Sequence, residues 1–294
     1  MTGHRLEPRS VVIHARQTIA ESDVARHYDE LDGFYRELWG EHLHHGLWEH
    51  GEESVDDAVR ALVRRVAANA AVRAQSRVCD VGSGYGATAR MLAADFGAHV
   101  TAFTLSPVQH ALAIAAAGQN ERVRYRLGDW LNAAVEAEAF DAVIAIESTE
   151  HMADKPRFFA QAAHALRPRG RLVVCAWLEA ERTSEGARRW LLEPICSEGR
   201  LPSLGRASDY TMWLRDAGFT LLSCDDLTSR VRPTWTLSTR RLLRRLFTRP
   251  SSWAYLLDRR NGNRVFALTV LRILAAYRFG AMRYAMFTAV RGEA

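Results

Sequence analysis

The sequence predicts an α/β protein built on a seven-stranded, mostly parallel, doubly wound sheet, with helical lid additions at both ends. Between residues 77 and 177, short runs rich in β-branched and aromatic residues alternate with segments of helical periodicity. This alternation indicates parallel strands, because parallel neighbours must be joined by a crossover. A glycine-rich loop, GSGYG at 82–86, lies between the first strand and the first helix of the series.

The individual elements follow from their local patterns. RVCDV, HVTAFT, FDAVIAI and RLVVCAW are short apolar runs, as expected for strands buried on both faces. The predicted strands cover 77–81, 99–104, 122–127, 140–146, 171–177, 219–226 and 282–290, and the predicted helices cover 86–96, 106–117, 158–166 and about 209–217. We expect one domain in three segments: a helical cap or lid (1–75), a ligand-binding core (76–177) and a core completion with substrate-binding helical insertions (178–294).

The composition is that of a globular protein with a sizeable core. Of 294 residues, 48% are hydrophobic and 25% are charged, which excludes a disordered or fibrous chain. The net charge of +5 is carried almost entirely by arginine, since Lys155 is the only lysine. Such a positive charge could attract nucleic acid or anionic lipid. Alternatively, the use of arginine in place of lysine reflects the base composition of the genome. The four cysteines form no CxxC pair and no secretory or membrane-spanning run is found, so we expect a cytoplasmic protein.

The glycine loop is compatible with two kinds of ligand. Its glycines let the backbone approach a ligand closely and aim a helix N-terminus at that ligand. The same residues satisfy the G-x-G-x-x-G/A fingerprint of dinucleotide-binding proteins. Asp80, two residues before the first glycine, separates the two alternatives. Its carboxylate would repel a pyrophosphate and attract a cationic ligand that carries an ammonium and a sulfonium.

The ends of the next two strands give a second criterion. A dinucleotide enzyme has an acidic residue for the ribose hydroxyls about 20 residues on, but residues 101–106 read TAFTLS. Asp129, after the third predicted strand, is instead suited to accept a hydrogen bond from an adenine amine, with Trp130 beside it. The pattern therefore favours an S-adenosylmethionine-dependent methyltransferase over a dehydrogenase.

Four segments carry a family resemblance: VCDVGSGYGATA, VTAFTLSPVQ, LGDW and IAIESTEHMADKPRFF. Their order and spacing resemble class I methyltransferases of Rossmann-like fold, in the sterol, tocopherol and cyclopropane-fatty-acid-synthase group. That group has a TLSPVQ-like segment in place of the acidic ribose ligand, and residues 28–49 and 275–290 are similar to its γ-tocopherol branch. The resemblance implies S-adenosyl-L-methionine as cofactor, with Thr104 and Gln109 as ribose contacts. The implied cofactor site comprises Asp80, Gly82, Ser83, Gly84, Gly86, Thr104, Leu105, Gln109, Asp129, Trp130, Ile146 and Glu147.

The catalytic candidates follow the fourth predicted strand. Methyl transfer from a sulfonium is an in-line displacement that mainly needs alignment, which can supply about 7–11 kcal/mol. A weakly acidic acceptor also needs a base. Glu147, Glu150 and His151 lie where open α/β sheets bind their ligands, and His151 titrates near neutrality. Alternatively, His151 caps the following helix and Glu147 only shapes the pocket.

Aromatic residues outside the core predict a lid and an acceptor pocket. The resemblance implies a lid over the cofactor, whereas plain helix packing by the aromatic residues is the alternative. The lid residues would be Tyr28, Tyr35, Trp39 and His45. The later insertions are expected to roof an apolar, ring-sized or prenyl-bearing acceptor with Trp190, Trp213 and Trp235.

The remaining features concern partners. His42, His44, His45 and His50 lack the regular spacing of a helical zinc site, so we expect no metal. Residues 230–260 carry nine arginines and a single acid, Asp258. Contact of the segment 230–280 with anionic lipid and a solvated basic face are both consistent with this charge. We expect no nucleic-acid partner, because the N/D-P-P-Y/F signature of base methyltransferases is absent.

The sequence thus predicts methyl transfer to a small hydrophobic metabolite, with His151 or a neighbouring glutamate as the base. The acceptor is the ring carbon of a tocopherol-type phenol or quinol, or an O, N or C atom of a secondary metabolite. A prenyl diphosphate C-methyltransferase, a nucleic-acid methyltransferase and a non-catalytic cofactor-binding scaffold are the alternatives. The acceptor atom and the oligomeric state are left open.

Overall fold

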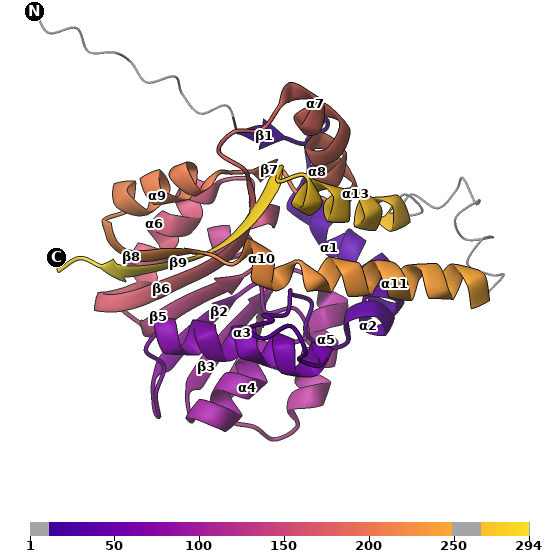
Figure 1. The fold of residues 1–294 in the computed structure, drawn as a ribbon. Helices are drawn as coiled ribbons and strands as arrows, with labels where there is room; N and C mark the ends of the chain where they lie inside the picture. Colours follow the sequence, from indigo (N-terminus) through magenta and orange to yellow (C-terminus); the bar gives the residue numbers. More distant parts are fainter. Residues whose placement is uncertain (1–11, 249–265, 294) are drawn as a thin grey trace, which may run out of the picture.

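A seven-stranded sheet forms the centre of the structure, a computed structural model that describes residues 12–248 and 266–293 (Figure 1). Its strands are β2 (Arg77–Val81), β3 (His99–Thr104), β4 (Val123–Leu127), β5 (Phe140–Ile146), β6 (Leu166–Glu179), β8 (Phe219–Asp226) and β9 (Met282–Arg291). The order is β4-β3-β2-β5-β6-β9-β8, and only β9 runs antiparallel to its neighbours. The predicted seven-stranded, mostly parallel sheet is confirmed.

Helices cover both faces of this sheet. One face carries α3 (Val55–Asn69), α4 (Ala87–Phe96) and α5 (Pro107–Ala117), and the other carries α6 (Lys155–Ala165) and α9 (Ala207–Asp216) (Figure 1). Local chemistry explains where several of them begin. The side chains of Ser54, Ser106 and Asp154 accept hydrogen bonds from the first-turn backbone N–H groups of α3, α5 and α6.

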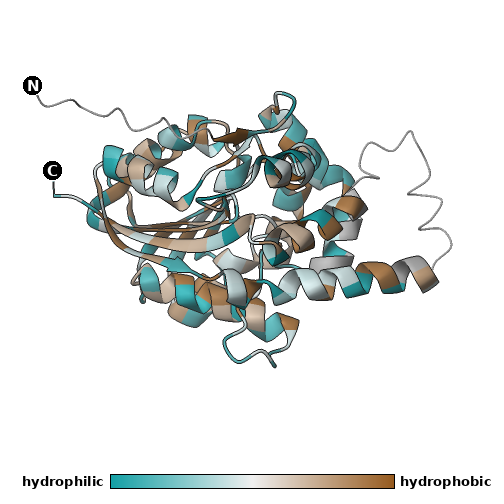
Figure 2. Cartoon of the chain, turned by 45° about the horizontal axis from the view of Figure 1, so that its top comes forward, coloured by the Kyte–Doolittle hydropathy of each residue, from teal (hydrophilic) through white to brown (hydrophobic). Residues whose placement is uncertain are grey.

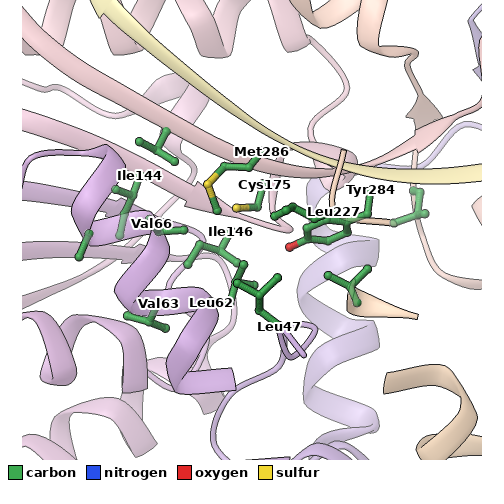
Figure 3. Packing of buried hydrophobic residues seen from close by; sticks show 14 of the residues in the cluster. Leu47, Leu62, Val63, Val66, Ile144, Ile146, Cys175, Leu227, Tyr284 and Met286 are labelled. Carbon is green, nitrogen blue, oxygen red and sulfur yellow. The ribbon is translucent and has the colours of Figure 1, made fainter. Parts of the chain in front are cut away.

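Strand β5 shows how one sequence buries two faces. Ala142, Ile144 and Ile146 belong to the core on the α3 side, whereas Val143 and Ala145 belong to the core on the α6 side. Figure 3 shows Ile144 and Ile146 in the first of these cores, together with residues of α3. Burying one such aliphatic side chain stabilises the fold by about 1.5–3 kcal/mol. This period of two on a strand that is apolar throughout is what a parallel sheet covered on both faces requires.

One strand differs from its prediction. β6 begins at Leu166, five residues before the predicted 171, and α6 ends at Ala165. Leu166 pairs with Phe140 across a register shift, and Arg171–Glu179 pairs along its whole length with β9. The polar sequence RPRG at 167–170 resembles a turn locally, so only the pairing with neighbouring strands reveals the extension.

The additions lie over the carboxyl ends of the parallel strands (Figure 1). They comprise α1 (Glu21–Glu30) and α2 (Asp32–Trp39) near the N-terminus, and α10 (Thr228–Val231), α11 (Pro233–Thr248) and α13 (Phe266–Arg278) near the C-terminus. The insertion after β6 forms α7 (Glu185–Ala187), η3 (Arg188–Leu192), α8 (Glu193–Glu198) and β7 (Ser203–Leu204), and β7 pairs with β1 (Ile13–His14). Figure 2 shows hydrophobic strands enclosed between helices with hydrophilic outer surfaces.

Candidate active site

The glycine loop after β2 needs its glycines for steric reasons. Gly82 has φ +83, in the left-handed region, and a Cβ there would overlap the Cβ of Ser148. Gly86 has φ +71, and a Cβ would overlap the ring of Tyr125. The loop therefore follows a path that only glycine permits, with α4 beginning directly after it.

Replacing Gly82 with alanine is expected to destabilise the protein by about 2–4 kcal/mol, from left-handed strain plus overpacking against Ser148. Gly97→Ala is the matched control, because Gly97 is also left-handed (φ +68, ψ 23), but a Cβ there would lie at an ordinary contact distance of 3.6 Å from Ala74. Urea unfolding should show a loss of only about 1 kcal/mol for the control. Equal losses for the two variants would contradict the steric argument.

Asp80 is a buried carboxyl that faces a cavity without a partner for one of its oxygens. Its side chain lies at the carboxyl end of β2 and is 2% exposed. Oδ2 has no hydrogen-bond partner among the described residues. Burial raises the pKa of Asp80 to about 7. A group that supplies a positive charge and N–H donors would satisfy this carboxylate.

The cavity beside Asp80 contains about 1130 Å³ of space. All the residues predicted to bind the cofactor line it except Gly86, the N-cap of α4. Two further buried polar atoms on lining residues, Ser83 Oγ and Trp130 Nε1, have no partner among the described residues. An apolar cavity with orphaned buried polar groups along its length fits a ligand with an amino-acid end and an aromatic base, as S-adenosylmethionine has.

The far end of this cavity is organised by hydrogen bonds between side chains. Thr104 Oγ1 donates to Gln109 Oε1 at 3.2 Å, and both residues are buried. Asp129 accepts from Leu131 N at 3.0 Å and from Asn132 Nδ2 at 2.6 Å. Helix α1 covers this end, and burial together with the neighbouring Asp129 raises the pKa of Glu21. The sequence did not single out Glu21 or the neighbouring Val24 as cavity residues.

A second cavity of about 630 Å³ adjoins the first. The two share Tyr28, Leu43, Glu147 and His151 in their linings. Trp177 and Trp235 contribute to its aromatic walls, and Ile195, Leu201 and Ile273 contribute aliphatic surface. Its lining includes two carboxyl groups but no arginine or lysine. The arrangement suits a cofactor in the first cavity and an apolar acceptor in the second.

His151 lies at the junction with one ring nitrogen fixed as a donor. Its Nδ1 lies 3.1 Å from the carbonyl oxygen of Arg200, which can only accept, so Nδ1 carries the hydrogen. Nε2 is then an acceptor, and the Tyr28 hydroxyl donates to it at 2.8 Å. Burial lowers the pKa of His151 to about 4, so the ring is neutral at pH 7. A neutral imidazole with its lone pair at the junction can act as a base.

Glu147 is held too firmly to act as a base in this arrangement. Its carboxylate accepts from His45 N and Nδ1, Trp177 Nε1 and Tyr284 Oη, all at 2.8–2.9 Å. Burial alone would raise its pKa, but the contacts with His45 outweigh burial and lower it to about 2. Its backbone has φ +54. These contacts favour the alternative in which Glu147 shapes the pocket.

The aromatic residues predicted for the lid and roof divide into two groups. Tyr28, Tyr35, His45 and Trp235 line the second cavity, and Tyr28 stacks on Tyr35 with ring centroids 5.4 Å apart. The side chain of Trp39 lies outside the described residues.

Trp190 and Trp213 do not line the second cavity. Trp190 is 68% exposed, with Arg189 over its ring. Trp213 packs beside Phe159 and Tyr210 on the opposite face of the sheet. Hydrophobicity predicted that these rings contact apolar surface, but not which surface. The sequence missed Trp177, whose position at the end of a predicted strand was an available signal, and also Thr269 and Ile273 of α13.

The histidine segment forms hydrogen bonds within itself. His42 Nδ1 lies 3.1 Å from His44 Nε2, and His44 Nδ1 lies 2.9 Å from the carbonyl oxygen of His45. In residues 12–248 and 266–293, no three His, Cys, Asp or Glu side chains are grouped so that they could hold a metal ion. His42 and His44 line the first cavity.

Comparison with known proteins shows similarity to one protein family and to several methyltransferases. The model of the mycolic acid cyclopropane synthetase family matches residues 15–246. A tocopherol O-methyltransferase of Arabidopsis thaliana, described as chloroplastic, is 28% identical over 95% of this chain and 85% of its own length. A probable tocopherol O-methyltransferase of Oryza sativa subsp. japonica is 33% identical over 72% of this chain, and the match spans 63% of the rice protein. The crystal structure of the [4+2]-cyclase SpnF, 27% identical, superposes with a TM-score of 0.78 over 95% of this chain and 100% of that one.

Proposed function

Because the chain belongs to the mycolic acid cyclopropane synthetase family of S-adenosylmethionine-dependent methyltransferases, we propose that it methylates a small, apolar, ring-bearing metabolite. The preferred acceptor is a tocopherol-type phenol or quinol, methylated at oxygen or at a ring carbon. The observation that carries this proposal is the junction of two cavities at Tyr28 and His151, where a neutral base faces both.

The first cavity would hold the cofactor. Asp80 would pair with the ammonium of S-adenosylmethionine, Thr104 and Gln109 would contact the ribose, and Asp129 and Trp130 would contact the adenine. When bound, this cofactor supplies a methyl group already activated by the sulfonium. The chain contributes alignment and exclusion of water, through α1 over one end and the aromatic walls of the second cavity.

His151 would remove the acceptor proton. As the bound cofactor supplies its methyl group to the acceptor, the acceptor proton would pass to Nε2 of His151. Tyr28 occupies Nε2 in this structure, so it either yields that position to the acceptor or relays the proton through its hydroxyl. The carbonyl of Arg200 stabilises the imidazolium through Nδ1–H.

The cavity linings argue against two of the alternatives. A prenyl diphosphate would bring several negative charges, yet neither large cavity is lined by arginine or lysine. The described arginines of α11 do not line them either. A nucleic acid would present charged phosphates around any base, whereas the acceptor cavity has aromatic and aliphatic walls. The similarity to the [4+2]-cyclase SpnF makes a [4+2] cyclisation the second candidate.

A screen with S-adenosylmethionine labelled in the methyl group tests the function. The purified protein would be offered phenols, quinols including γ-tocopherol, alkaloids and prenyl diphosphates, with product identified by mass spectrometry. We expect label in a phenol or quinol. Label confined to prenyl diphosphates would overturn the acceptor assignment. Tight cofactor binding without any labelled product would support the second candidate instead.

We also propose that the C-terminal helices contact an anionic membrane surface. Among the described residues, no helix is long and apolar enough to cross a bilayer. However, α11 extends outward (Figure 1), exposes Leu243 and Phe247, and, like α13, contains arginines but no acidic residue. Both helices also line the acceptor cavity, so a lipid-borne acceptor would enter close to this surface. The part of the predicted 230–280 segment between 249 and 265 lies outside the described residues.

Sedimentation with vesicles checks this contact. Binding to phosphatidylglycerol-containing vesicles should exceed binding to pure phosphatidylcholine and decline with salt. The double variant Arg240→Glu/Arg244→Glu should weaken it at least about tenfold, since each basic residue near the surface contributes about 1 kcal/mol. Arg124→Glu/Arg126→Glu, on the exposed edge strand β4, makes the same charge change elsewhere and should have little effect. Equal losses would show that only net charge matters.

The state of the cysteines bears on the cellular compartment of the protein. Cys79, Cys175 and Cys196 are buried free thiols and Cys224 is an exposed one, as in a reducing environment. We therefore propose a cytoplasmic protein, although the Arabidopsis relative is described as chloroplastic.

A further inference from the structure

Glu150 is a buried carboxyl of the acceptor cavity with one oxygen only weakly engaged. It lies in η2 (Thr149–His151), is 2% exposed and lines the second cavity. The backbone N–H of Trp177 donates to Oε1. At Oε2 the partner is Thr149 Oγ1, at a long 3.3 Å. Glu147, by contrast, accepts four hydrogen bonds of 2.8–2.9 Å, so of the two carboxyls only Glu150 has a weakly engaged oxygen.

A negative charge on Glu150 would be offset only in part, by the nearby ammonium of Lys155. Within residues 12–248 and 266–293 Glu150 forms no ion pair, and the ammonium of Lys155 is committed elsewhere. The Nζ of Lys155 donates to Met152 O at 3.1 Å, Ser203 O at 3.0 Å and Ser203 Oγ at 2.7 Å, which uses all three of its hydrogens. Glu147 is already ionised nearby, so a second charge in this cavity would be both desolvated and repelled.

These contacts define a proton donor. A carboxyl that is buried, outside any ion pair and close to a carboxylate keeps its proton. Burial together with Glu147 raises the pKa of Glu150 to about 8, and this outweighs the opposing hydrogen bond from Trp177 and the charge of Lys155. A neutral carboxyl has one O–H donor, whereas an ionised one can only accept. Because Oε1 accepts from Trp177, the hydrogen belongs on Oε2, the weakly engaged oxygen.

We propose that Glu150 recognises the acceptor as a neutral acid, donating a hydrogen bond from Oε2 to a carbonyl, ether or hydroxyl oxygen of that molecule. This deepens the proposed function and rests on its assignment of the second cavity to the acceptor. The expected acceptors are then apolar molecules that carry an oxygen atom at some distance from the acceptor atom that faces His151. A pure hydrocarbon would leave the O–H of Glu150 without a hydrogen-bond acceptor. The site should therefore bind a hydrocarbon less tightly than an oxygen-bearing molecule of the same shape.

Other titratable groups around Glu150 must be separated from it in any pH experiment. They are Glu147 and His151 from its own segment, Lys155 of α6, Tyr28 of α1, Tyr210 of α9, Tyr277 of α13, and Cys175 and Tyr284 of the sheet. Burial raises the pKa of each tyrosine and of Cys175, so these groups stay neutral in mild alkali. Burial lowers the pKa of Lys155 to about 8, so only Lys155 titrates in the same range as Glu150.

Two probes of the same shape test the proposal without any methyl transfer. 2-Acetylnaphthalene carries a ketone oxygen where 2-isopropenylnaphthalene carries a CH₂ group. Both would be titrated into the S-adenosylhomocysteine complex, with binding followed by quenching of tryptophan fluorescence, since Trp177 and Trp235 line the cavity. At pH 7 we expect the ketone to bind roughly 3- to 10-fold more tightly than the alkene, the range for one neutral hydrogen bond.

Variants and pH assign that preference to Glu150. Glu150→Gln keeps an N–H donor and should retain the preference at pH 7 and at pH 9.5, whereas the parent protein should lose it at pH 9.5. Because Glu150→Gln still contains Lys155, it controls for titration of that lysine. Glu150→Leu should lose the preference at both pH values, and S-adenosylhomocysteine affinity and melting temperature report whether it is folded.

Several outcomes would overturn the proposal. These are equal binding of the two probes by the parent protein at pH 7, a parent preference that persists at pH 9.5, or loss of the preference in Glu150→Gln. If Glu150→Leu does not fold, the parent protein and Glu150→Gln still decide. Failure here is distinct from failure of the proposed function, because a protein that transfers no methyl group can still prefer the ketone.

Discussion

Replacing Asp80 with asparagine is expected to weaken S-adenosylmethionine binding by about 100-fold and to raise the stability of the cofactor-free protein at pH 8. The affinity falls because a buried, charge-assisted hydrogen bond to the ammonium is lost, an interaction worth about 1.5–3 kcal/mol. The stability rises because the parent protein buries an ionised carboxyl whose Oδ2 has no partner among the described residues. One substitution thus separates the effect of Asp80 on the stability of the cofactor-free protein from its effect on cofactor affinity.

The pH dependence follows from the direction of the pKa shift. Burial raises the pKa of Asp80 to about 7, above its value in an unfolded chain. The folded state therefore binds this proton more tightly, and the resulting stability is fully present below about pH 3.9 and is lost as pH rises through 7. Cofactor binding needs the ionised form, so affinity in the parent protein should rise with pH up to about 7 and then level off. Asp80→Asn should remove both dependences.

Calorimetric titration at pH 6, 7 and 8, with thermal melts of the same samples, measures both effects. Asp95→Asn is the control, because Asp95 is an exposed aspartate on α4, the helix that follows the glycine loop. That variant should bind and melt like the parent protein. Retention of parent affinity by Asp80→Asn would refute the role of this carboxylate.

A larger effect on turnover is expected from His151→Asn, which should lower kcat by about 10²–10⁴-fold while leaving cofactor affinity nearly unchanged. Asparagine can still contact Tyr28 but cannot take up a proton. Tyr28→Phe should cause a smaller loss if the tyrosine only positions the ring, and a loss of similar size if it relays the proton. Rates are to be measured on the acceptor identified by the labelled-methyl screen.

The pH profile gives this prediction a second readout. Burial lowers the pKa of His151 to about 4, so the base form persists through the neutral range, and kcat at saturating cofactor should decline only as pH falls through about 4. A histidine with a lowered pKa also destabilises the fold as pH falls below about 6.5, because the unfolded chain takes up the proton first. Circular dichroism at each pH separates unfolding from protonation of the base. His164→Asn, on the exposed face of α6, is the control and should retain parent turnover.

The sheet and the cofactor cavity were accessible from sequence because each is encoded locally. Continuous apolar runs such as FDAVIAI predict a strand with two buried faces, and Asp80 and Asp129 lie at or just after strand ends that must share one edge of the sheet. Gly82 was predicted to let a ligand approach the backbone closely. A second reason for glycine at this position is that a Cβ would overlap the side chain of Ser148.

The acceptor cavity was accessible only in part, because it is assembled from distant segments. Thr269 and Ile273 reach it from α13, and Tyr284 reaches Glu147 because β9 inserts between β6 and β8. No local pattern reports such contacts. For the same reason, the sequence predicted that the rings of Trp190 and Trp213 contact apolar surface, but it did not predict where those rings lie. The same limit also applies to Glu147, whose four donors come from distant segments and favour the alternative in which it shapes the pocket.

Those four donors have a thermodynamic consequence. Glu147 is a wall common to both cavities and is tied to the 45–46 loop, β6 and β9, and through His45 to Trp235 of α11. A ligand that stiffens this wall from one side prepares it for a ligand on the other. Linkage then requires reciprocity: whatever factor the cofactor adds to acceptor affinity, the acceptor must return to the cofactor. A carboxylate that shapes the pocket can in this way couple the binding of two substrates.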